Sequence, residues 1–226
     1  MESVLDQNSI SESSIFANRG DLHIARKIWH ILMGLFILGV IFLKNLSPVE
    51  SGLILGFFLA LSVVVESFRL RSSRWNKRLL KFFSKIIRED EAEQISGIPY
   101  YLAGVMVSVV LFPAPVSYVS ILFLVFGDPA ASVFGISFGS LGPRLKNGKS
   151  LVGTLSAVFV CSWVAWAFCL PLYGASTKLV VLSVLSGIIG GTAELIPVDL
   201  DDNFIIPVVS GAGVWLLFGL LGFPTV

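Results

Sequence analysis

Long apolar runs alternate with short polar segments along most of the chain. Seven runs are read as helices that cross a lipid bilayer, whose hydrocarbon core of about 30 Å needs about 20 helical residues. They cover residues 28–43, 51–65, 95–112, 116–138, 151–173, 179–198 and 204–223. The first two are short and would depend on tilt and on basic side chains that reach the interface. Since the runs lack the short alternating strands of a membrane barrel, we predict an all-α fold, a polytopic membrane helical bundle with about seven spans.

Two polar segments stand apart from these spans. Residues 1–22 are Ser-rich and mildly acidic, which is typical of a disordered arm, and nothing in them resembles a signal peptide. Residues 69–94 place Trp75, Leu79 and Ile86 at helical spacing, with Lys and Arg between them. This pattern predicts an amphipathic helix at the membrane interface. Residues 23–226 are expected to form one transmembrane domain that carries the candidate chemistry.

Basic residues are distributed unequally between the two ends of the predicted spans. All but two of the 16 Lys and Arg residues fall on one side, the exceptions being Lys44 and Lys178. By the positive-inside rule this side, which includes the N-terminus, is cytoplasmic. Composition agrees with a membrane protein, since 55% of residues are hydrophobic, 14% are charged and the mean hydropathy is +0.86. The net charge of +1 hides an asymmetry that fits an anionic lipid surface and gives little reason to expect nucleic acid.

One carboxylate stands inside a run that is otherwise suited to the bilayer. Asp128, in LVFGDPAASVFG, is the only charged residue between Gln94 and Pro143. A charge at that depth costs about 2.5–3.5 kcal/mol on insertion scales, and such residues usually face the bundle interior and serve a function. Asp128 is therefore a candidate catalytic residue.

The segment after Asp128, GISFGSLGPRLKNGKSLVGT, is rich in glycine and basic residues. Backbone amides of a glycine-rich turn at a helix N-terminus, together with Arg144 and Lys149, suit a polyphosphate. The segment is not a P-loop, because five residues separate Gly142 from Gly148 where that motif has four. A basic loop that only obeys the positive-inside rule is an equally good interpretation of this segment alone.

The last loop on the same side, AELIPVDLDDNFIIP, is acidic. It places Glu194, Asp199, Asp201, Asp202 and Asn203 close together in the sequence. Mutual repulsion would raise the pKa values of these carboxylates unless a cation neutralises them, and Mg²⁺ commonly takes one or two carboxylates plus substrate phosphates. A solvated acidic turn is the alternative. With Asp128 and the basic loop, this segment predicts metal-assisted phosphoryl or nucleotidyl transfer to a membrane lipid.

These segments also carry a family resemblance. FGDPAASVFGISFG, KNGKSLVGT and AELIPVDLDDNFIIP resemble motifs of the CTP-dependent lipid kinases, namely dolichol kinase, phytol kinase and CTP-dependent diacylglycerol kinase, which are relatives of phosphatidate cytidylyltransferase. ARKIWHILMG resembles the Arg-Lys-x-x-His-x-x-x-Gly opening of that group, and VVVESFR resembles its Glu-x-x-Arg. The similarity covers about residues 24–211. One departure is Pro129, where family members often carry Thr or Ser.

The resemblance implies transfer of the γ-phosphoryl group of CTP to the hydroxyl of a membrane lipid alcohol, which could be a polyprenol, phytol or diacylglycerol. It further implies Mg²⁺ or another divalent cation. The expected location is the cell inner membrane, with the active site facing the cytoplasm.

The same resemblance implies roles for the matching residues. The catalytic set is Asp128, Lys149, Glu194, Asp201 and Asp202. The nucleotide-binding set is Gly127, Ser132, Arg144, Lys146, Ser150, Gly153, Thr154 and Asn203. The metal-binding set is Asp128, Asp199, Asp201 and Asp202, in which Asp199 is included by position alone. The substrate set is Arg26, Lys27, His30 and Glu66. For the first three of these, an interfacial anchor and a capped core histidine are at least equally good interpretations.

Two other functions fit parts of the sequence. Phosphatidate cytidylyltransferase shares the Gly-Asp motif and the Lys-containing loop, but its C-terminal signature includes a Gly-His-Gly-Gly turn and the chain has no histidine after His30. A small transporter could use Asp128 and Glu194 as ion or proton sites between broken helices. Transporters, however, seldom need a basic and an acidic loop at one membrane face.

Overall fold

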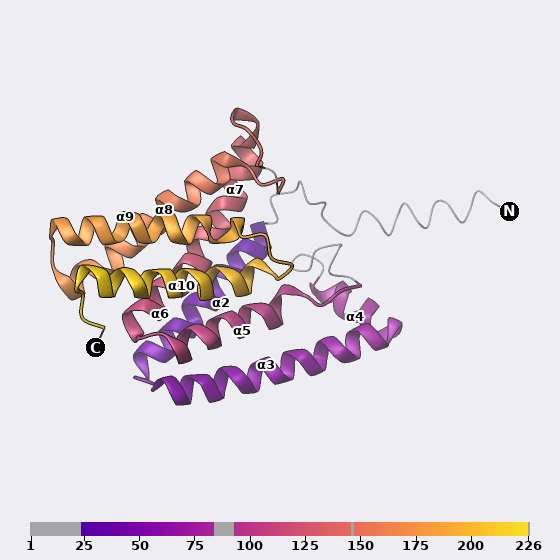
Figure 1. The fold of residues 1–226 in the computed structure, drawn as a ribbon. Coiled ribbons are helices and arrows are strands. Elements are labelled where there is room, and N and C mark those ends of the chain that lie inside the picture. Colours follow the sequence, from indigo (N-terminus) through magenta and orange to yellow (C-terminus); the bar gives the residue numbers. More distant parts are fainter. Residues whose placement is uncertain (1–23, 84–92, 146, 226) are drawn as a thin grey trace.

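The computed structural model describes residues 24–83, 93–145 and 147–225, and the ordered elements among these residues are helices. The main helices are α2 (Ile24–Leu43), α3 (Pro48–Arg71), α4 (Ser73–Phe83), α5 (Gly97–Leu111), α6 (Ala114–Leu122), α7 (Asp128–Phe138), α8 (Leu151–Tyr173), α9 (Thr177–Thr192) and α10 (Asp202–Leu221). Short turns are η2 (Phe123–Gly127, π-helical), η3 (Gly139–Leu141) and η4 (Ala193–Leu195). All except α4 run back and forth side by side (Figure 1). The predicted helical membrane bundle is confirmed.

The helices follow the predicted spans, with two informative differences. Helix α3 continues beyond residue 65 to Arg71, because Glu66 and Arg69 form an ion pair along the helix and their charges do not end it. Helix α5 begins only after Ser96 and has 15 residues, which corresponds to about 22 Å at 1.5 Å per residue. Among the described residues, six helical segments therefore have the length and hydropathy of a full span, and α5 is a shorter apolar helix.

The centre of the bundle is built around η2 and α10. Phe123, Leu124 and Val125 of η2 are fully buried, as is Phe218 of α10. Helices α8 and α9 pack closely because α9 presents glycine to its neighbour: a Cβ at Gly187 would lie 2.5 Å from the backbone nitrogen of Ser162. Small residues of this kind let helix backbones approach each other inside membranes. Close packing of this kind holds α8 and α9 together beside the loops that connect them to their neighbours.

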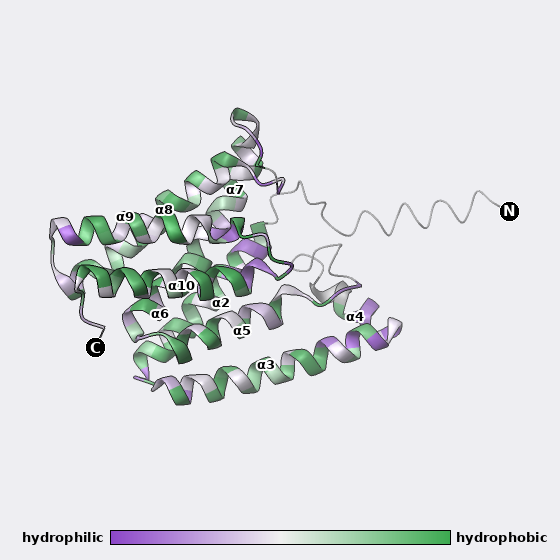
Figure 2. Cartoon of the chain, viewed as in Figure 1, coloured by the Kyte–Doolittle hydropathy of each residue, from purple (hydrophilic) through white to green (hydrophobic). Residues whose placement is uncertain are grey.

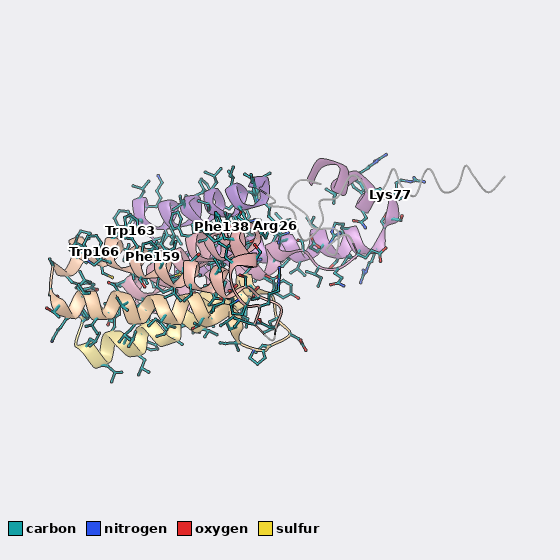
Figure 3. All side chains as sticks on the ribbon, turned by 90° about the horizontal axis from the view of Figure 1, so that it is seen from above. Arg26, Lys77, Phe138, Phe159, Trp163 and Trp166 are labelled. Carbon is teal, nitrogen blue, oxygen red and sulfur yellow. The ribbon has the colours of Figure 1, made fainter. Side chains whose placement is uncertain are left out.

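Because the helices alternate in direction, several polar connections meet at one end of the bundle. In Figure 2 the hydrophilic colour gathers where α2 begins, α3 ends, and the α7–α8 and α9–α10 loops turn. Figure 3 shows Arg26 at this polar end, whereas Trp163 and Trp166 of α8 lie toward the opposite one. The expected meeting of the basic and acidic loops thus has a structural basis.

The amphipathic helix expected over 69–94 is observed as α4, Ser73–Phe83. Trp75 and Arg78 lie on it together, with the guanidinium carbon 5.9 Å from the ring centroid. Residues 84–92 and the predicted N-terminal arm, 1–22, lie outside the described residues. The position of α4 at a membrane surface stays a prediction.

Candidate active site

The loop before α8 is a tight turn that presents Lys149. The amide of Leu145 donates to the carbonyl of Lys149 at 2.7 Å, and the amide of Gly148 donates to the carbonyl of Leu145 at 2.8 Å. Gly148 has a φ of +80°, a left-handed conformation that glycine adopts without steric cost. Arg144 Nη1 donates to the Gly148 carbonyl at 3.1 Å and braces the turn. Lys146, predicted to bind nucleotide, lies outside the described residues.

The ammonium group of Lys149 joins this loop to the acidic one. Its Nζ donates to the Glu194 carbonyl at 2.8 Å and to Glu194 Oε2 at 3.2 Å. It also donates to Asp202 Oδ2 at 3.0 Å. Thr154 Oγ1 donates to Glu194 Oε1 at 3.4 Å. These four residues, here called the Lys149 cluster, bring together the starts of α8 and α10 and the turn that follows α9.

The cluster fixes the charge of Lys149. Burial would lower its pKa, but the negative charges of Glu194 and Asp202 and the hydrogen bonds to both outweigh burial and raise the pKa above its usual range. The Lys149 side chain is 28% exposed and that of Asp202 is 45% exposed. A charged ammonium that solvent can reach is suited to binding an anion.

Ser150 adds an unpaired hydroxyl next to Lys149. It stands at the N-cap of α8, yet its Oγ is buried without a hydrogen-bond partner among the described residues. It lies against η3, where a Cβ at Gly139 would be 3.0 Å from this oxygen. Because buried polar atoms are nearly always bonded in native proteins, an unsatisfied one in a candidate site indicates a group that awaits a ligand or water.

The N-terminus of α10 forms a second polar group beside the cluster. Asp201 caps this helix, accepting a hydrogen bond from the Asn203 amide at 2.9 Å. The buried side chain of Asn203 donates to the Gly97 carbonyl at 3.4 Å. Gly97 leaves room for this approach, since a Cβ there would lie 2.6 Å from Asn203 Nδ2 and 3.2 Å from Arg26 Nη2. Helices α2, α5 and α10 therefore meet at this point.

Asp128 lies half-buried at the start of α7 and faces the same region. Its carboxylate interacts electrostatically with the side chains of Glu194, His30 and Tyr101. No hydrogen bond from another described side chain reaches its carboxylate. The lone intramembrane aspartate is thus close to the Lys149 cluster and has its oxygens available.

Other predicted site residues lie around this centre with different contacts. Gly127 and Gly153 are used in helix packing, since a Cβ at either would lie 2.5 Å from an atom of the facing helix, Cys161 Sγ and the Ala131 carbonyl respectively. Ser132 is half-buried on α7, and its hydroxyl makes no hydrogen bond to a described residue. Lys27 is half-buried in the first turn of α2.

Asp199 lies exposed in the α9–α10 loop and makes no contact with the Lys149 cluster within the described residues. Its expected metal-binding role, which was included by position alone, gains no support from the geometry. That role stays a prediction.

Glu66 belongs to a separate buried network. Its Oε2 accepts from Arg69 Nη2 at 2.7 Å and from the Ser96 amide at 3.1 Å, and its Oε1 accepts from Ser96 Oγ at 2.9 Å. Arg69 also donates to Asn76 Oδ1 at 3.0 Å and to the Gln94 carbonyl. These bonds fasten the corner between α3 and α4 to the start of α5. Glu66 therefore lies with this network rather than with Asp128 or Lys149.

The carboxylates of the Lys149 cluster could hold a divalent cation only together with other ligands. Within the described part of the chain, no group of three or more His, Cys, Asp or Glu side chains could hold a metal ion by itself. Two carboxylates, Glu194 and Asp202, nevertheless converge on one point, which the Lys149 ammonium occupies. This donor set fits Mg²⁺ of the kind that is bound by one or two carboxylates and completed by substrate phosphates and water.

Three residues that contact the predicted site residues were not identified from the sequence: Gly97, Tyr101 and Arg69. Gly97 and Tyr101 lie in an apolar stretch with no charge or motif to mark them, so no local signal could have found them. Arg69 carried a signal, because the Glu-x-x-Arg spacing of VVVESFR places both side chains on one helix face. Only the glutamate of that pair was assigned a role.

Comparison with known proteins identifies relatives. A protein of Eremothecium gossypii named CTP-dependent diacylglycerol kinase 1 is 30% identical over 83% of this chain and 64% of its own length. One of the same name from Schizosaccharomyces pombe is 29% identical over 86% of this chain and 93% of its own. Probable phytol kinase 1 of Oryza sativa is 26% identical over 87% of this chain and 65% of its own length. No family model and no solved structure matches. The chain, a polytopic membrane protein, is thus similar over most of its length to proteins named as CTP-dependent diacylglycerol kinases and a probable phytol kinase.

Proposed function

We propose that this protein transfers the γ-phosphoryl group of CTP to the hydroxyl of a membrane lipid alcohol. The observation that carries the proposal is the Lys149 ammonium, held between Glu194 and Asp202 at one end of a membrane helix bundle. The carboxylate of Asp128 interacts with Glu194, and no other described side chain hydrogen-bonds to it. A cation for the phosphates and a carboxylate for the acceptor are the two parts that phosphoryl transfer needs from a protein.

The nucleotide is expected to bind at the start of α8. Lys149 would exchange a carboxylate for phosphate oxygens, and the Ser150 hydroxyl, which has no hydrogen-bond partner among the described residues, would donate to the same group. The N-terminal amides of α8 add a positive potential at this position, as helix N-termini do for anions generally. Arg144, which is exposed on the same loop, would add charge from the solvent side.

The lipid hydroxyl is expected to approach Asp128. Its oxygen forms the new bond to the γ-phosphorus, while the bond from that phosphorus to the β-phosphate oxygen breaks and CDP leaves. The proton of the hydroxyl passes to a carboxylate, for which Asp128 is the best placed because its oxygens have no other described side-chain partner. The products are a lipid phosphate and CDP.

Glu194 and Asp202 would also hold a divalent cation once phosphates have drawn Lys149 away, with Asp201 and Asp128 nearby. When bound, Mg²⁺ supplies neutralisation of the charge on the β- and γ-phosphates. The part played by this chain is to keep two carboxylates converging on one point through the rigid starts of α8 and α10.

The acceptor is a lipid that reaches the site from the bilayer. The named relatives differ in acceptor, since they include diacylglycerol kinases and a probable phytol kinase. Diacylglycerol is the first candidate, because the two diacylglycerol kinases named above are more similar to this chain than the phytol kinase is. We further propose that the polar end faces the cytoplasm, with the basic residues of α4 on the anionic leaflet.

The test is product analysis with CTP labelled at either the α- or the γ-phosphate, over a panel of diacylglycerol, phytol and polyprenol, with ATP and GTP in parallel. A kinase places γ-label in the lipid and releases CDP. Appearance of α-label in the lipid, with pyrophosphate released, would instead indicate a cytidylyltransferase. Addition of EDTA should abolish the reaction and excess Mg²⁺ should restore it.

A further inference from the structure

The helix that leads to Asp128 contains a π-helical turn, η2, at Phe123–Gly127. In such a turn each carbonyl pairs with the N–H five residues ahead. For Leu124 that residue is Pro129, which has no N–H. The Leu124 carbonyl is fully buried and needs a donor from elsewhere, because an unpaired buried carbonyl is costly.

His30 of α2 supplies that donor. Its Nε2 lies 3.0 Å from the Leu124 carbonyl oxygen, and since a carbonyl only accepts, the ring must carry its proton on Nε2. The ring is held edge-on against Tyr101, with centroids 4.8 Å apart and planes at 88°. The Tyr101 hydroxyl in turn donates to the His30 carbonyl at 3.4 Å. His30 is thereby fixed from two helices, α5 and η2.

The hydrogen bond from His30 to the Leu124 carbonyl matters because the π-helical turn ends immediately before Asp128. The number of residues in a helical turn decides the direction of the next side chain, and a return to a regular α-helical turn would rotate Asp128 by most of one residue step, about 100°. π-Helical turns are also frequent at functional sites. Whatever holds η2 therefore decides where the Asp128 carboxylate points.

We propose that His30 is a positioning residue, which holds the π-helical turn through the Leu124 carbonyl and so aims Asp128 at the acceptor hydroxyl. This inference rests on the proposed function for its catalytic consequence and on contacts alone for its structural one. It replaces direct substrate contact as the role of His30, since Nε2 is already engaged with Leu124. Pro129 and His30 then form one device, in which the proline removes a donor and the histidine restores it.

Two substitutions at His30 separate the effect of its aromatic ring from the effect of its hydrogen-bond donor. His30→Phe keeps an aromatic edge against Tyr101 and loses the donor, whereas His30→Gln keeps a donor near the Nε2 position and loses the ring. We expect His30→Phe to lower kcat by about 10²-fold, as a misplaced catalytic group does, with the KM for CTP changed by less than about threefold. His30→Gln should recover most of kcat. Ser120→Ala, which deletes a buried hydroxyl bonded to the Ser117 carbonyl on α6, is the matched control and should leave kcat unchanged.

Two double variants test the route of the effect. Pro129→Ala gives the Leu124 carbonyl its own backbone donor, so His30→Phe should cost several-fold less in that background. In an Asp128→Asn background, His30→Phe should cause no further loss of kcat, because residues that act through one another are not additive. Additive losses in both backgrounds would overturn the inference.

A readout that needs no activity keeps the inference separate from the kinase proposal. Hydrogen exchange of the peptide covering 123–128 should be faster in His30→Phe than in the wild type, and close to wild type in His30→Gln. If the wild type phosphorylates no lipid, the proposed function fails, and this exchange pattern alone decides the structural link. Unchanged exchange in His30→Phe, or a raised KM for CTP in both His30 variants, would overturn the positioning role.

Discussion

The Nζ of Lys149 lies 3.0 Å from Oδ2 of Asp202, although 53 positions separate the two residues in the chain. This contact and the neighbouring one to Glu194 close the basic loop onto the acidic loop. The ammonium offsets part of the negative charge of the two carboxylates, and the contacts hold the loops in place. In the proposed function, a bound triphosphate would replace carboxylate oxygens with phosphate oxygens around an ammonium that is already oriented, and such preorganisation is a main source of electrostatic catalysis.

Removal of the positive charge of Lys149 is expected to slow lipid phosphorylation strongly. Lys149→Met should lower the CTP-dependent rate by roughly 10²–10³-fold, the usual effect of deleting one oriented donor at a transferring group. Initial rates of lipid phosphorylation at saturating acceptor measure this. Lys178→Met, at the opposite end of the bundle, is the matched control and should leave the rate unchanged. A Lys149→Met enzyme with wild-type rates would remove the ammonium from the mechanism.

The raised pKa of Lys149 makes a prediction about stability and pH. A folded-state pKa above the unfolded one means that the contribution to stability is fully present below the unfolded pKa, roughly pH 10, and declines as pH rises through the folded value. The difference in Tm between wild type and Lys149→Met in detergent should therefore be constant from about pH 7.5 to 9.5 and shrink above about pH 10.5. A difference that already vanished near pH 8 would mean that burial, not the two carboxylates, dominates.

Much of this arrangement follows from local sequence signals. Runs of apolar residues give the helices, and the meeting of the two loops follows from helix direction and the positive-inside rule. The π-helical turn is different. Pro129 is visible in the sequence, but the donor that makes the turn tolerable is His30, 94 residues away, and only tertiary packing brings it there. For the same reason Gly97 could not be identified, since it matters through the space it leaves for Asn203 and Arg26.

Variants of Glu66 and Arg69 distinguish a structural role of Glu66 from a role in substrate binding. Arg69→Ala leaves the Glu66 carboxylate buried without its cation and should lower the free energy of unfolding by about 3–5 kcal/mol. Glu66→Gln keeps one acceptor oxygen for Arg69 and the Ser96 amide, and its NH2 group can donate to Ser96 Oγ, so its Tm should fall by less. Thermal denaturation of the purified variants measures both. If Glu66 contacts substrate instead, Glu66→Gln will raise the KM for the lipid acceptor while the Tm of Arg69→Ala stays at the wild-type value.

The proposed orientation can be checked without enzymatic assay. Single cysteines replacing Leu200, which is exposed in the acidic loop, and Lys178, at the other end of the bundle, should be labelled from opposite sides of the membrane. A membrane-impermeant maleimide applied to intact cells should modify Lys178→Cys and leave Leu200→Cys unmodified until the membrane is opened. The native Cys161 and Cys169 are both buried and give the background. Labelling of both variants from outside would contradict the assignment of the polar end to the cytoplasm.

Asp128 tests the central claim most directly. In one measurement, purified wild type and Asp128→Asn are given γ-labelled CTP and diacylglycerol in lipid vesicles, and label in the lipid is counted beside label bound to the protein. The control is Glu50→Gln, which changes an exposed carboxylate in the first turn of α3, at the end of the bundle away from the Lys149 cluster, and should match the wild type. The account predicts that Asp128→Asn still binds CTP within severalfold of the wild type, yet transfers γ-label at least about 10²-fold more slowly, as loss of a general base implies. Undiminished transfer by Asp128→Asn would contradict it.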